Sequence, residues 1–292
     1  MTGAYLDRLA ARTAAVGSVM CLGLDPDPAA LPRGFSRDLA GVERFARLVV
    51  EAAVPYAAAI KPNLAFFEAF GSAGMATLER IIESLPPGLP LVLDGKRGDI
   101  GTTVARQAVA LFDRLGADAV TVNPYLGEEA VAPLLERPDR FAYILCRTSN
   151  PGSTELQSLG VAADAATGAP AEPLYLRVAR RATRWGPGGT VGLVAGATAP
   201  AELAAIRGVA PGLPFLVPGI GAQGGPPEPV LASGRATASP GVGRPGGGLL
   251  VNVSRAIAGA ANGAPSADGP VDPGERISAA ARDWAARLPV LP

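Results

Sequence analysis

Short apolar runs alternate with amphipathic segments along most of the sequence. The apolar runs are three to six residues long and almost continuously hydrophobic, which is typical of strands buried on both faces. They lie at 19–24, 57–60, 91–93, 119–122, 141–145, 191–195, 215–217 and 249–251. Between them, apolar residues recur at helical spacing, as at Val42, Phe45 and Val49. Helices are predicted over about 42–53, 75–85, 104–115, 128–135, 171–185, 201–207 and 277–288.

This alternation of strands and helices predicts an α/β protein with a parallel sheet covered by helices. Eight strands close such a sheet into a barrel, and barrels of this kind need ~250 residues. We therefore expect a single (β/α)8 TIM barrel of eight parallel strands, with residues 1–292 forming one domain. The alternative is an open doubly wound sheet, although no GxGxxG follows the first strand.

Clusters of glycine and proline indicate where long loops lie. They occur at 224–229, 234–248 and 263–274. We expect the first two at the end of the barrel that carries the active site in this fold, and the third before the last helix. Residues 156–170 are small and polar, and they predict a mobile loop after the fifth strand.

Composition narrows the function classes. Hydrophobic residues make up 48% of the chain and charged residues 18%, which favours a folded protein with a large core. The formal net charge is zero, which argues against a dedicated nucleic-acid binder, and no apolar run reaches the ~20 residues that cross a membrane. Residues 1–17 include Asp7, Arg8 and Arg12 and do not resemble a signal peptide, so we expect a cytoplasmic protein.

Three scarce residue types limit the chemistry. There is no histidine, which excludes Ser-His-Asp and Cys-His catalysis and removes the commonest zinc ligand. Cys21 and Cys146 fall in apolar runs and are expected to be small buried side chains, with no disulfide or metal site. Of the 26 basic residues 24 are arginine, so Lys61 and Lys96 stand out. Either they are leftover surface lysines, or they lie where a cation must be able to give up a proton.

Charged residues follow the first three strands, where the active site of a barrel lies. Asp25 follows the first strand, Lys61 the second, and Asp94 and Lys96 the third. Because alternate strand residues point the same way, Asp94 and Lys96 should share one face at the mouth of the barrel. Buried charges are costly unless paired, so a purely structural ion pair is the alternative. For Asp99, the alternative is a cap on the following helix.

The loops after the last two strands indicate an anion-binding site. Residues 218–225 are glycine-rich and include Gly221, Gln223 and Gly224, and glycines let backbone N–H groups approach an anion closely. Ser254 and Arg255 follow the eighth strand, and arginine binds phosphate with two parallel hydrogen bonds. These two loops form the usual phosphate site of the barrel, although either alone fits an ordinary turn. After the fifth strand, residues 147–152 form a polar turn suited to bonding a planar ring.

These segments together resemble a known family. The sequence DGKRGDI at 94–100 is similar to the DxKxxD signature of orotidine 5'-monophosphate decarboxylases, and its context LVLDGKRGDIGTT resembles the longer-chain bacterial subgroup. Further segments agree in order and position over roughly 18–257: CLGLDPDP, IKPNLAFFE, TVNPYLG, RTSNPGS, VAGATAP, PGIGAQGG and VNVSRAI. DxKxxD alone also occurs in a sugar-phosphate decarboxylase and a hexulose-phosphate synthase, whereas the whole set is highly specific.

The resemblance implies decarboxylation of orotidine 5'-monophosphate to uridine 5'-monophosphate and CO2, the last step of de novo pyrimidine nucleotide synthesis, without cofactor or metal. Lys96 would stabilise the charge that develops at C6 and then protonate it. Asp94 would lie near the departing carboxylate, and Lys61 would orient Asp94 and contact the ribose. The carbanion has no resonance sink, so a preplaced cation beside carboxylates suits this chemistry.

The resemblance also implies residues that bind the substrate and residues that act across a homodimer. Asp25 would bind ribose hydroxyls, and Ser149 would hydrogen-bond the pyrimidine. Asp99 and Thr103 would reach across the dimer interface into the partner's site. The phosphate would be held by Gln223, Arg255, Gly221, Gly224 and Ser254.

Three other functions remain open at this point. A metal-dependent sugar-phosphate enzyme of the same superfamily would use the same barrel. A Schiff-base aldolase would use Lys96 as its nucleophile, but neighbouring carboxylates oppose the loss of the proton that this role needs. An inactive barrel that only binds nucleotides would have little need for the charged cluster.

Overall fold

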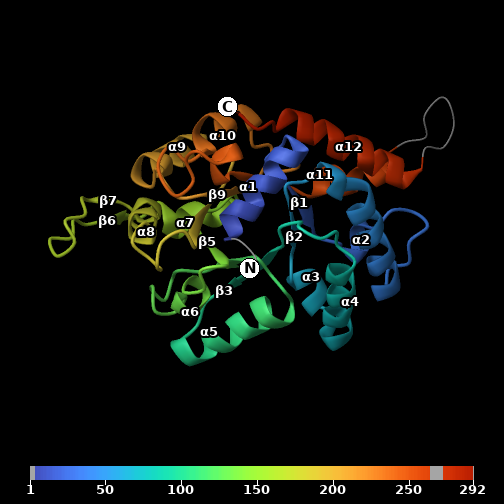
Figure 1. The fold of residues 1–292 in the computed structure, drawn as a ribbon, viewed down its shortest axis with the longest axis horizontal. Helices are drawn as coiled ribbons and strands as arrows, with labels where there is room; N and C mark the ends of the chain where they lie inside the picture. Colours follow the sequence, from blue (N-terminus) through green and yellow to red (C-terminus); the bar gives the residue numbers. More distant parts are fainter. Residues whose placement is uncertain (1–3, 264–271, 292) are drawn as a thin grey trace.

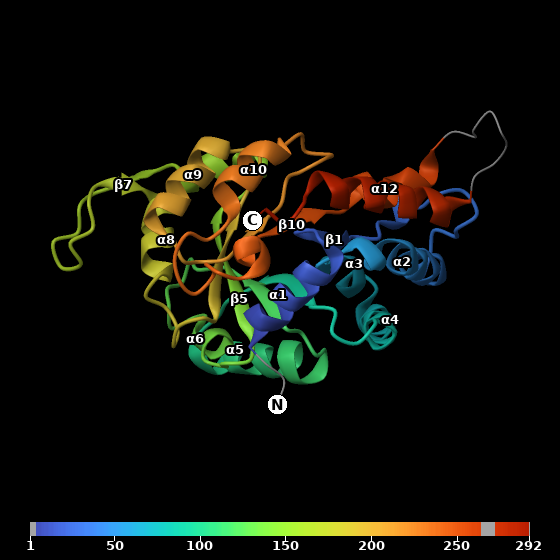
Figure 2. The same ribbon diagram turned by 45° about the horizontal axis from the view of Figure 1, so that its top comes forward.

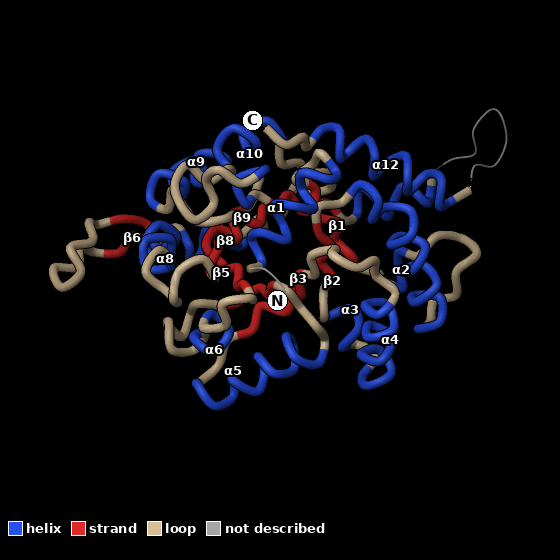
Figure 3. The backbone as a smooth tube through the Cα atoms, viewed as in Figure 1, coloured by secondary structure: helices blue, strands red, loops and turns tan. Residues whose placement is uncertain are grey.

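Eight parallel strands form the centre of the molecule. The computed structural model describes residues 4–263 and 272–291. Figure 1 and Figure 3 show the strands gathered in the middle with most helices outside them. The strands are β1 (Met20–Leu24), β2 (Ala59–Pro62), β3 (Val92–Arg97), β4 (Ala119–Val122), β5 (Phe141–Arg147), β8 (Val191–Ala195), β9 (Phe215–Val217) and β10 (Leu250–Val253).

The helices follow the strands in the alternation that the hydrophobic pattern predicts. Each of the longer ones buries an apolar stripe against the sheet, as α2 does with Val42, Phe45 and Val49. Their bounds are α1 (Tyr5–Val16), α2 (Leu39–Ala53), α3 (Ala65–Glu68), α4 (Gly71–Glu83), α5 (Gly101–Ala108), α6 (Ala132–Leu135), α7 (Thr154–Gln157), α8 (Leu174–Ala182), α9 (Pro200–Val209), α10 (Pro227–Gly234), α11 (Arg255–Ala258) and α12 (Pro273–Arg287).

The sheet closes on itself into a barrel. Its strand order is β2-β1-β10-β9-β8-β5-β4-β3, and every pairing in it is parallel. The two ends of this order, β2 and β3, are joined by parallel bridges between Ile60 and Leu91 and between Asn63 and Asp94. The predicted (β/α)8 barrel is therefore confirmed, and the open doubly wound alternative is wrong.

Both faces of the strands are buried, as the continuous apolar runs predict. On β5, Phe141 and Tyr143 point into the barrel, whereas Ala142 and Ile144 pack outward with the helices. The same alternation holds on the other strands, because successive side chains point to opposite faces. The barrel interior is consequently a packed apolar layer with a polar layer above it.

Helix α1 lies across the end of the barrel at which the strands begin (Figure 2). Its residues Tyr5, Leu6 and Leu9 pack with the inward-facing apolar residues of the strands. The hydroxyl groups of Tyr5 and Tyr143 lie 3.0 Å apart in this interior. The sequence analysis did not predict α1, although its buried residues Tyr5, Leu6, Leu9 and Thr13 recur at helical spacing.

Several predicted boundaries need correction. The helix predicted over 128–135 is helical only from Ala132, because Pro133 is tolerated in the first turn but not later. Part of the loop predicted over 224–229 is instead the start of α10, whose first turn contains Pro227 and Pro229. The predicted helix over 104–115 is α5 followed by one π-helical segment, Val109–Arg114.

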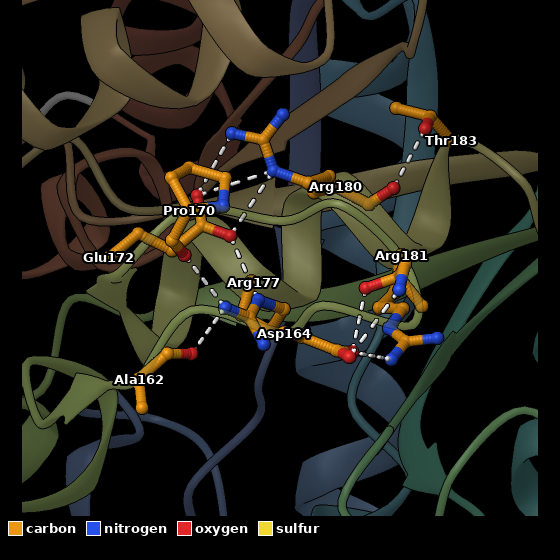
Figure 4. Close-up of polar contacts among 9 residues, drawn as sticks. Ala162, Asp164, Pro170, Glu172, Arg177, Arg180, Arg181 and Thr183 are labelled. Atoms are coloured by element: carbon orange, nitrogen blue, oxygen red, sulfur yellow. Dashed lines mark hydrogen bonds and ion pairs between the residues drawn. The ribbon is translucent and has the colours of Figure 1, made fainter.

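The loop predicted over 156–170 also contains regular structure. It includes the end of α7 and leads into a two-stranded antiparallel hairpin of β6 (Gly160–Val161) and β7 (Glu172–Pro173), which projects from the molecule in Figure 1. Figure 4 shows how the hairpin is attached to α8: Glu172 forms ion pairs with Arg177 and Arg180, at 2.9 and 3.0 Å. Asp164 pairs with Arg181 at 3.0 Å.

Two remaining expectations concern cysteines and the last loop. Cys21 and Cys146 are both free and buried, as expected for small core side chains. Most of the loop predicted over 263–274 lies outside the described residues. No helix among the described residues combines the length and the apolar composition of a membrane span.

Candidate active site

A cavity of about 460 Å³ opens where the strands end. It is bounded by residues from all eight strands of the barrel or from the loops that directly follow them. Most of its polar side chains come from the loops, and the others from the last inward-facing positions of the strands. The polar lining is Asp25, Lys61, Asn63, Asp94, Lys96, Thr121, Thr148, Ser149, Asn150, Gln157, Gln223, Asn252, Ser254 and Arg255.

The strand positions of the charged residues follow from the alternation of the sheet. Lys61 lies two residues after inward-facing Ala59 on β2, and Asp94 lies two residues after inward-facing Val92 on β3. Thr121 holds the same position on β4. These three side chains therefore extend the barrel interior upward as a polar layer, directly above its apolar filling.

Asp94 is the centre of this layer. Its Oδ2 accepts a hydrogen bond from the Lys61 ammonium at 2.6 Å, and its Oδ1 accepts one from the Lys96 ammonium at 2.7 Å. The Thr121 hydroxyl donates to Oδ1 as well, at 2.8 Å. Lys61 is 4% exposed, whereas the Lys96 side chain is half exposed and reaches into the cavity.

The electrostatics keep Asp94 and Lys61 charged. Burial alone would raise the pKa of Asp94, but the nearby ammonium groups of Lys61 and Lys96 outweigh it and hold that pKa well below its usual range. Burial lowers the pKa of Lys61, yet the carboxylates of Asp94 and Asp25 raise it above its usual value. A buried carboxylate therefore stays ionised between two cations at neutral pH.

The contact between Asp94 and Lys96 depends on an irregular strand. Between Leu93 and Arg97, β3 carries three residues, where β4 carries only Thr121 between Val120 and Val122. Lys96 has a left-handed backbone with φ of 48°, which is uncommon for a residue with a side chain. Simple alternation along a regular strand predicts the shared face of Asp94 and Lys96, but the structure achieves it through this bulge.

On the other side of the cavity, Ser149 and Gln223 form a hydrogen bond of 2.9 Å between the loops after β5 and β9. Two glycines make room for Ser149. A Cβ at Gly196 would lie 2.9 Å from the Ser149 backbone nitrogen, and one at Gly219 would lie 2.9 Å from the Ser149 Cβ. The close approach of these loops therefore requires glycine at both positions.

The end of β10 contributes three polar side chains. Arg255 is the first residue of α11 and makes no ion pair within the described part of the chain. The Oδ1 atom of Asn252 is buried and lacks a hydrogen-bond partner among the described residues. A Cβ at Gly23 would lie 2.6 Å from the Ser254 Cβ, so glycine at that position lets β10 place these side chains at the mouth.

Four residues that the sequence singled out do not line this cavity. Gly221 and Gly224 lie in the loop after β9 but not on the cavity wall, and both have positive φ, of 74° and 79°. Asp99 accepts a hydrogen bond from the Ile100 backbone at 2.7 Å but does not cap α5, whose N-cap is Ile100 itself. Thr103 is exposed on the first turn of α5.

Thr121 is the main lining residue that the sequence analysis missed. A threonine in an apolar run is also an ordinary strand former, so its type alone gives little signal. The available clue is position: it is the one polar residue of β4, on the strand next to Asp94 and Lys96. Asn63 and Asn252 were quoted in motifs but not singled out as site residues.

The cavity offers charge and hydrogen-bond donors rather than a metal-ligand set. Within 4–263 and 272–291, no three His, Cys, Asp or Glu side chains are grouped so that they could hold a metal ion. Cys21 lies below the charged layer, and burial raises the pKa of its thiol to about 12, so it is not a nucleophile at neutral pH.

The fold is a closed parallel barrel. Its mouth has a lysine–aspartate–lysine cluster on one side and an arginine with glycine-rich loops on the other. These features define the class of protein: a (β/α)8-barrel enzyme that acts on a small anionic substrate. The chain belongs to the orotidine 5'-phosphate decarboxylase / HUMPS family, whose model matches residues 18–268.

Curated relatives agree with this assignment. The orotidine 5'-phosphate decarboxylase of Herpetosiphon aurantiacus is 43% identical over 265 residues, which cover 90% of this chain and 92% of that protein. The enzyme of the same name from Thermomicrobium roseum is 46% identical over 254 residues, covering 87% of this chain and 86% of that protein.

Solved structures give the same result. The OMP decarboxylase of Leishmania donovani superposes with a TM-score of 0.77 at 38% identity and covers 97% of this chain and 96% of that one. The UMP synthase of Leishmania donovani superposes with a TM-score of 0.80 at 40% identity. That match covers 98% of this chain but only 56% of the UMP synthase chain.

Proposed function

We propose that this chain decarboxylates orotidine 5'-monophosphate to uridine 5'-monophosphate and CO2, with Lys96 as the central catalytic residue. The observation that carries the proposal is the Asp94 carboxylate held between two ammonium groups at 2.6 and 2.7 Å, in the cavity of a barrel of this family. The relatives that cover nearly all of this chain are named for the same reaction.

The chemistry follows from the charges. The substrate carboxylate lies beside Asp94, and the C–C bond electrons stay on C6 as CO2 leaves. The Lys96 ammonium stabilises this charge and then transfers a proton from Nζ to C6. Because the Lys96 side chain is half exposed, its amine regains a proton from solvent afterwards. Lys61 stays paired with Asp94 and fixes its orientation. No organic cofactor is needed as an electron sink.

The rest of the substrate extends across the cavity, from Lys96 toward the loops on the opposite side. In the ring of strands, β9 lies opposite β3, so the glycine-rich loop after β9 faces Lys96 across the cavity. We assign the phosphate to that loop, with Gln223, and to Arg255, and the pyrimidine to Ser149, whose hydroxyl donates to Gln223. Asp25 lies beside Lys61 and takes the ribose hydroxyls.

We further propose that two copies form a dimer through the loops after β3 and β4. These loops are adjacent, since the Asp99 backbone donates to the carbonyl of Ala130 at 3.1 Å. They expose three large apolar side chains, at 59% for Ile100, 80% for Tyr125 and 54% for Leu126. A second copy covering them would receive Asp99 and Thr103 in its own cavity.

The reaction is best placed in the cytoplasm. Cys21 and Cys146 are unpaired, which fits a reducing compartment, where thiols persist.

The test is the ultraviolet absorbance of orotidine 5'-monophosphate mixed with the purified protein and a chelator. We expect the orotidine absorbance to disappear with the wild type and to persist with Lys96→Ala. Arg97→Ala is the matched control, because Arg97 follows Lys96 but pairs with Glu68 away from the cavity, and this variant should keep its activity.

An unchanged absorbance with the wild-type protein would overturn the proposal. The family name also covers the HUMPS enzymes, which include the hexulose-phosphate synthase. The next candidate substrates would therefore be sugar phosphates, assayed with magnesium restored.

A further inference from the structure

Thr121 is the only residue of β4 that faces the irregular part of β3. Its neighbours Val120 and Val122 pair with Leu93 and Arg97, and they point outward into the packed layer beneath the helices. Thr121 points inward and is 2% exposed, yet it lines the cavity. One buried hydroxyl therefore lies opposite the three residues of β3 that include Asp94 and Lys96.

That hydroxyl makes two hydrogen bonds with these residues. Its oxygen accepts from the backbone N–H of Lys96 at 3.0 Å, and its proton is donated to Asp94 Oδ1 at 2.8 Å. Asp94 Oδ1 is the same atom that accepts from the Lys96 ammonium at 2.7 Å. Thr121 thus links the backbone of Lys96 to the Asp94 carboxylate, which binds the Lys96 ammonium.

The backbone of Lys96 needs such support. Its φ of 48° is in the left-handed region, which is unfavourable for any residue with a Cβ and persists only where surrounding contacts determine it. The bulge also removes Lys96 from the regular ladder between β3 and β4. Within the described residues, the hydrogen bond from the Lys96 N–H to Thr121 takes the place of a ladder bond.

We propose that Thr121 is a positioning residue, which sets the place of the Lys96 ammonium by fixing both the Lys96 backbone and the Asp94 carboxylate. This inference rests on the proposed decarboxylation. Thr121 itself exchanges no proton with the substrate. Its effect is on catalysis rather than on affinity, because the pyrimidine and phosphate contacts come from other loops, whereas proton transfer depends on the Lys96 position to within a fraction of an ångström.

Valine and serine separate the hydroxyl from the shape of the side chain. Thr121→Val keeps the volume but leaves the Lys96 N–H unpaired and removes a donor from Asp94. Thr121→Ser keeps the hydroxyl and loses only a methyl group. Thr13→Val is the matched control, because Thr13 is 1% exposed and its hydroxyl has no partner among the described residues.

The experiment measures kcat and KM for orotidine 5'-monophosphate and the Kd for uridine 5'-monophosphate in the wild type and the three variants. We expect Thr121→Val to lower kcat by roughly tenfold to a hundredfold, as small misplacements of catalytic groups do. KM and Kd should change by less than about threefold, since the binding loops are untouched. Thr121→Ser should recover kcat to within about threefold of the wild type, and Thr13→Val should match it.

Two results would overturn the inference while leaving decarboxylation in place. One is a Thr121→Val protein with kcat within about twofold of the wild type, and the other is a Thr121→Ser protein as slow as Thr121→Val. If Thr121→Val does not fold, Thr121→Ala opens space instead of adding a buried methyl group and carries the same expectation. A wild-type protein inactive on orotidine 5'-monophosphate would overturn the proposed function, and this inference with it.

Discussion

At the scale of single residues, the site is organised by one carboxylate with two differently used oxygens. Asp94 Oδ2 accepts a hydrogen bond from buried Lys61, and Oδ1 accepts hydrogen bonds from both Lys96 and Thr121. Removing either partner of such a buried pair leaves an uncompensated charge, which is costly. Lys61 therefore keeps the buried Asp94 carboxylate paired, whatever else contacts Oδ1.

The phosphate end can be tested separately from the reacting end. We expect Arg255→Ala to lower kcat/KM for orotidine 5'-monophosphate by about tenfold to a hundredfold, the loss typical of a hydrogen bond to a charged group. For orotidine, which has no phosphate, the same variant should have little effect, although orotidine itself should show lower turnover as well as lower affinity. Steady-state kinetics with both substrates measures this.

An equal loss on both substrates would show that Arg255 acts on something other than the phosphate. Equal turnover of the two substrates at saturation would contradict the proposed use of phosphate binding energy.

Much of this site could be predicted because strand ends in a barrel converge. Asp25, Lys61, Asp94 and Lys96 occupy such ends, and the structure brings them into one cavity. What the sequence did not indicate was the bulge in β3 or the role of Thr121. Both depend on the register between neighbouring strands, which residue types do not encode.

At the scale of secondary structure, accuracy depended on how a segment is buried. The apolar runs at 119–122, 191–195 and 215–217 coincide with β4, β8 and β9, because burial on both faces makes these segments almost continuously apolar. Helix α10 was missed because prolines that suggest a loop are also well suited to a first helical turn.

Helices α2 and α4 are linked by an ion-pair cluster with a predictable acid sensitivity. Glu43 accepts hydrogen bonds from Arg80 at 2.5 Å and from Arg47 at 2.9 Å. The Arg80 bond is the main cause that lowers the pKa of Glu43 from 4.5 to about 2. An acid with a depressed pKa in the folded state stabilises the fold above its unfolded pKa and loses that contribution as the pH falls.

We therefore expect Glu43→Gln to destabilise the protein by about 1 kcal/mol at neutral pH, the upper end for exposed ion pairs. The difference from the wild type should shrink as the pH falls from 4.5 to 2. Thermal or denaturant unfolding across that window measures it. Glu79→Gln is the control, because Glu79 is exposed on α4 and makes no ion pair within the described residues. A difference that stays constant down to pH 2 would contradict the assignment.

At the scale of the whole molecule, the exposed side chains beside Asp99 give a test of shared active sites. Lys96→Ala and Asp99→Ala should each be nearly inactive as pure dimers. Mixed together under subunit exchange, they should recover roughly a quarter of the wild-type activity, since half of the dimers become mixed and each mixed dimer has one intact site. Specific activity measured against mixing ratio checks this.

The control is a mixture of Lys96→Ala with Asp94→Ala. Each subunit supplies both of these residues to its own cavity, so every cavity in the mixture carries one of the two changes and should stay inactive. Absence of recovery with Asp99→Ala, despite demonstrated exchange, would place Asp99 in the site of its own subunit.

Within the described residues, helix α1 closes one end of the barrel, and the cavity opens at the other end. Tyr5, Phe141 and Tyr143 fill the end where the strands begin, with every one of these rings buried. The opposite end is therefore where the nucleotide substrate enters and where the nucleotide product and CO2 leave. The next substrate therefore cannot bind until the nucleotide product has left through this end.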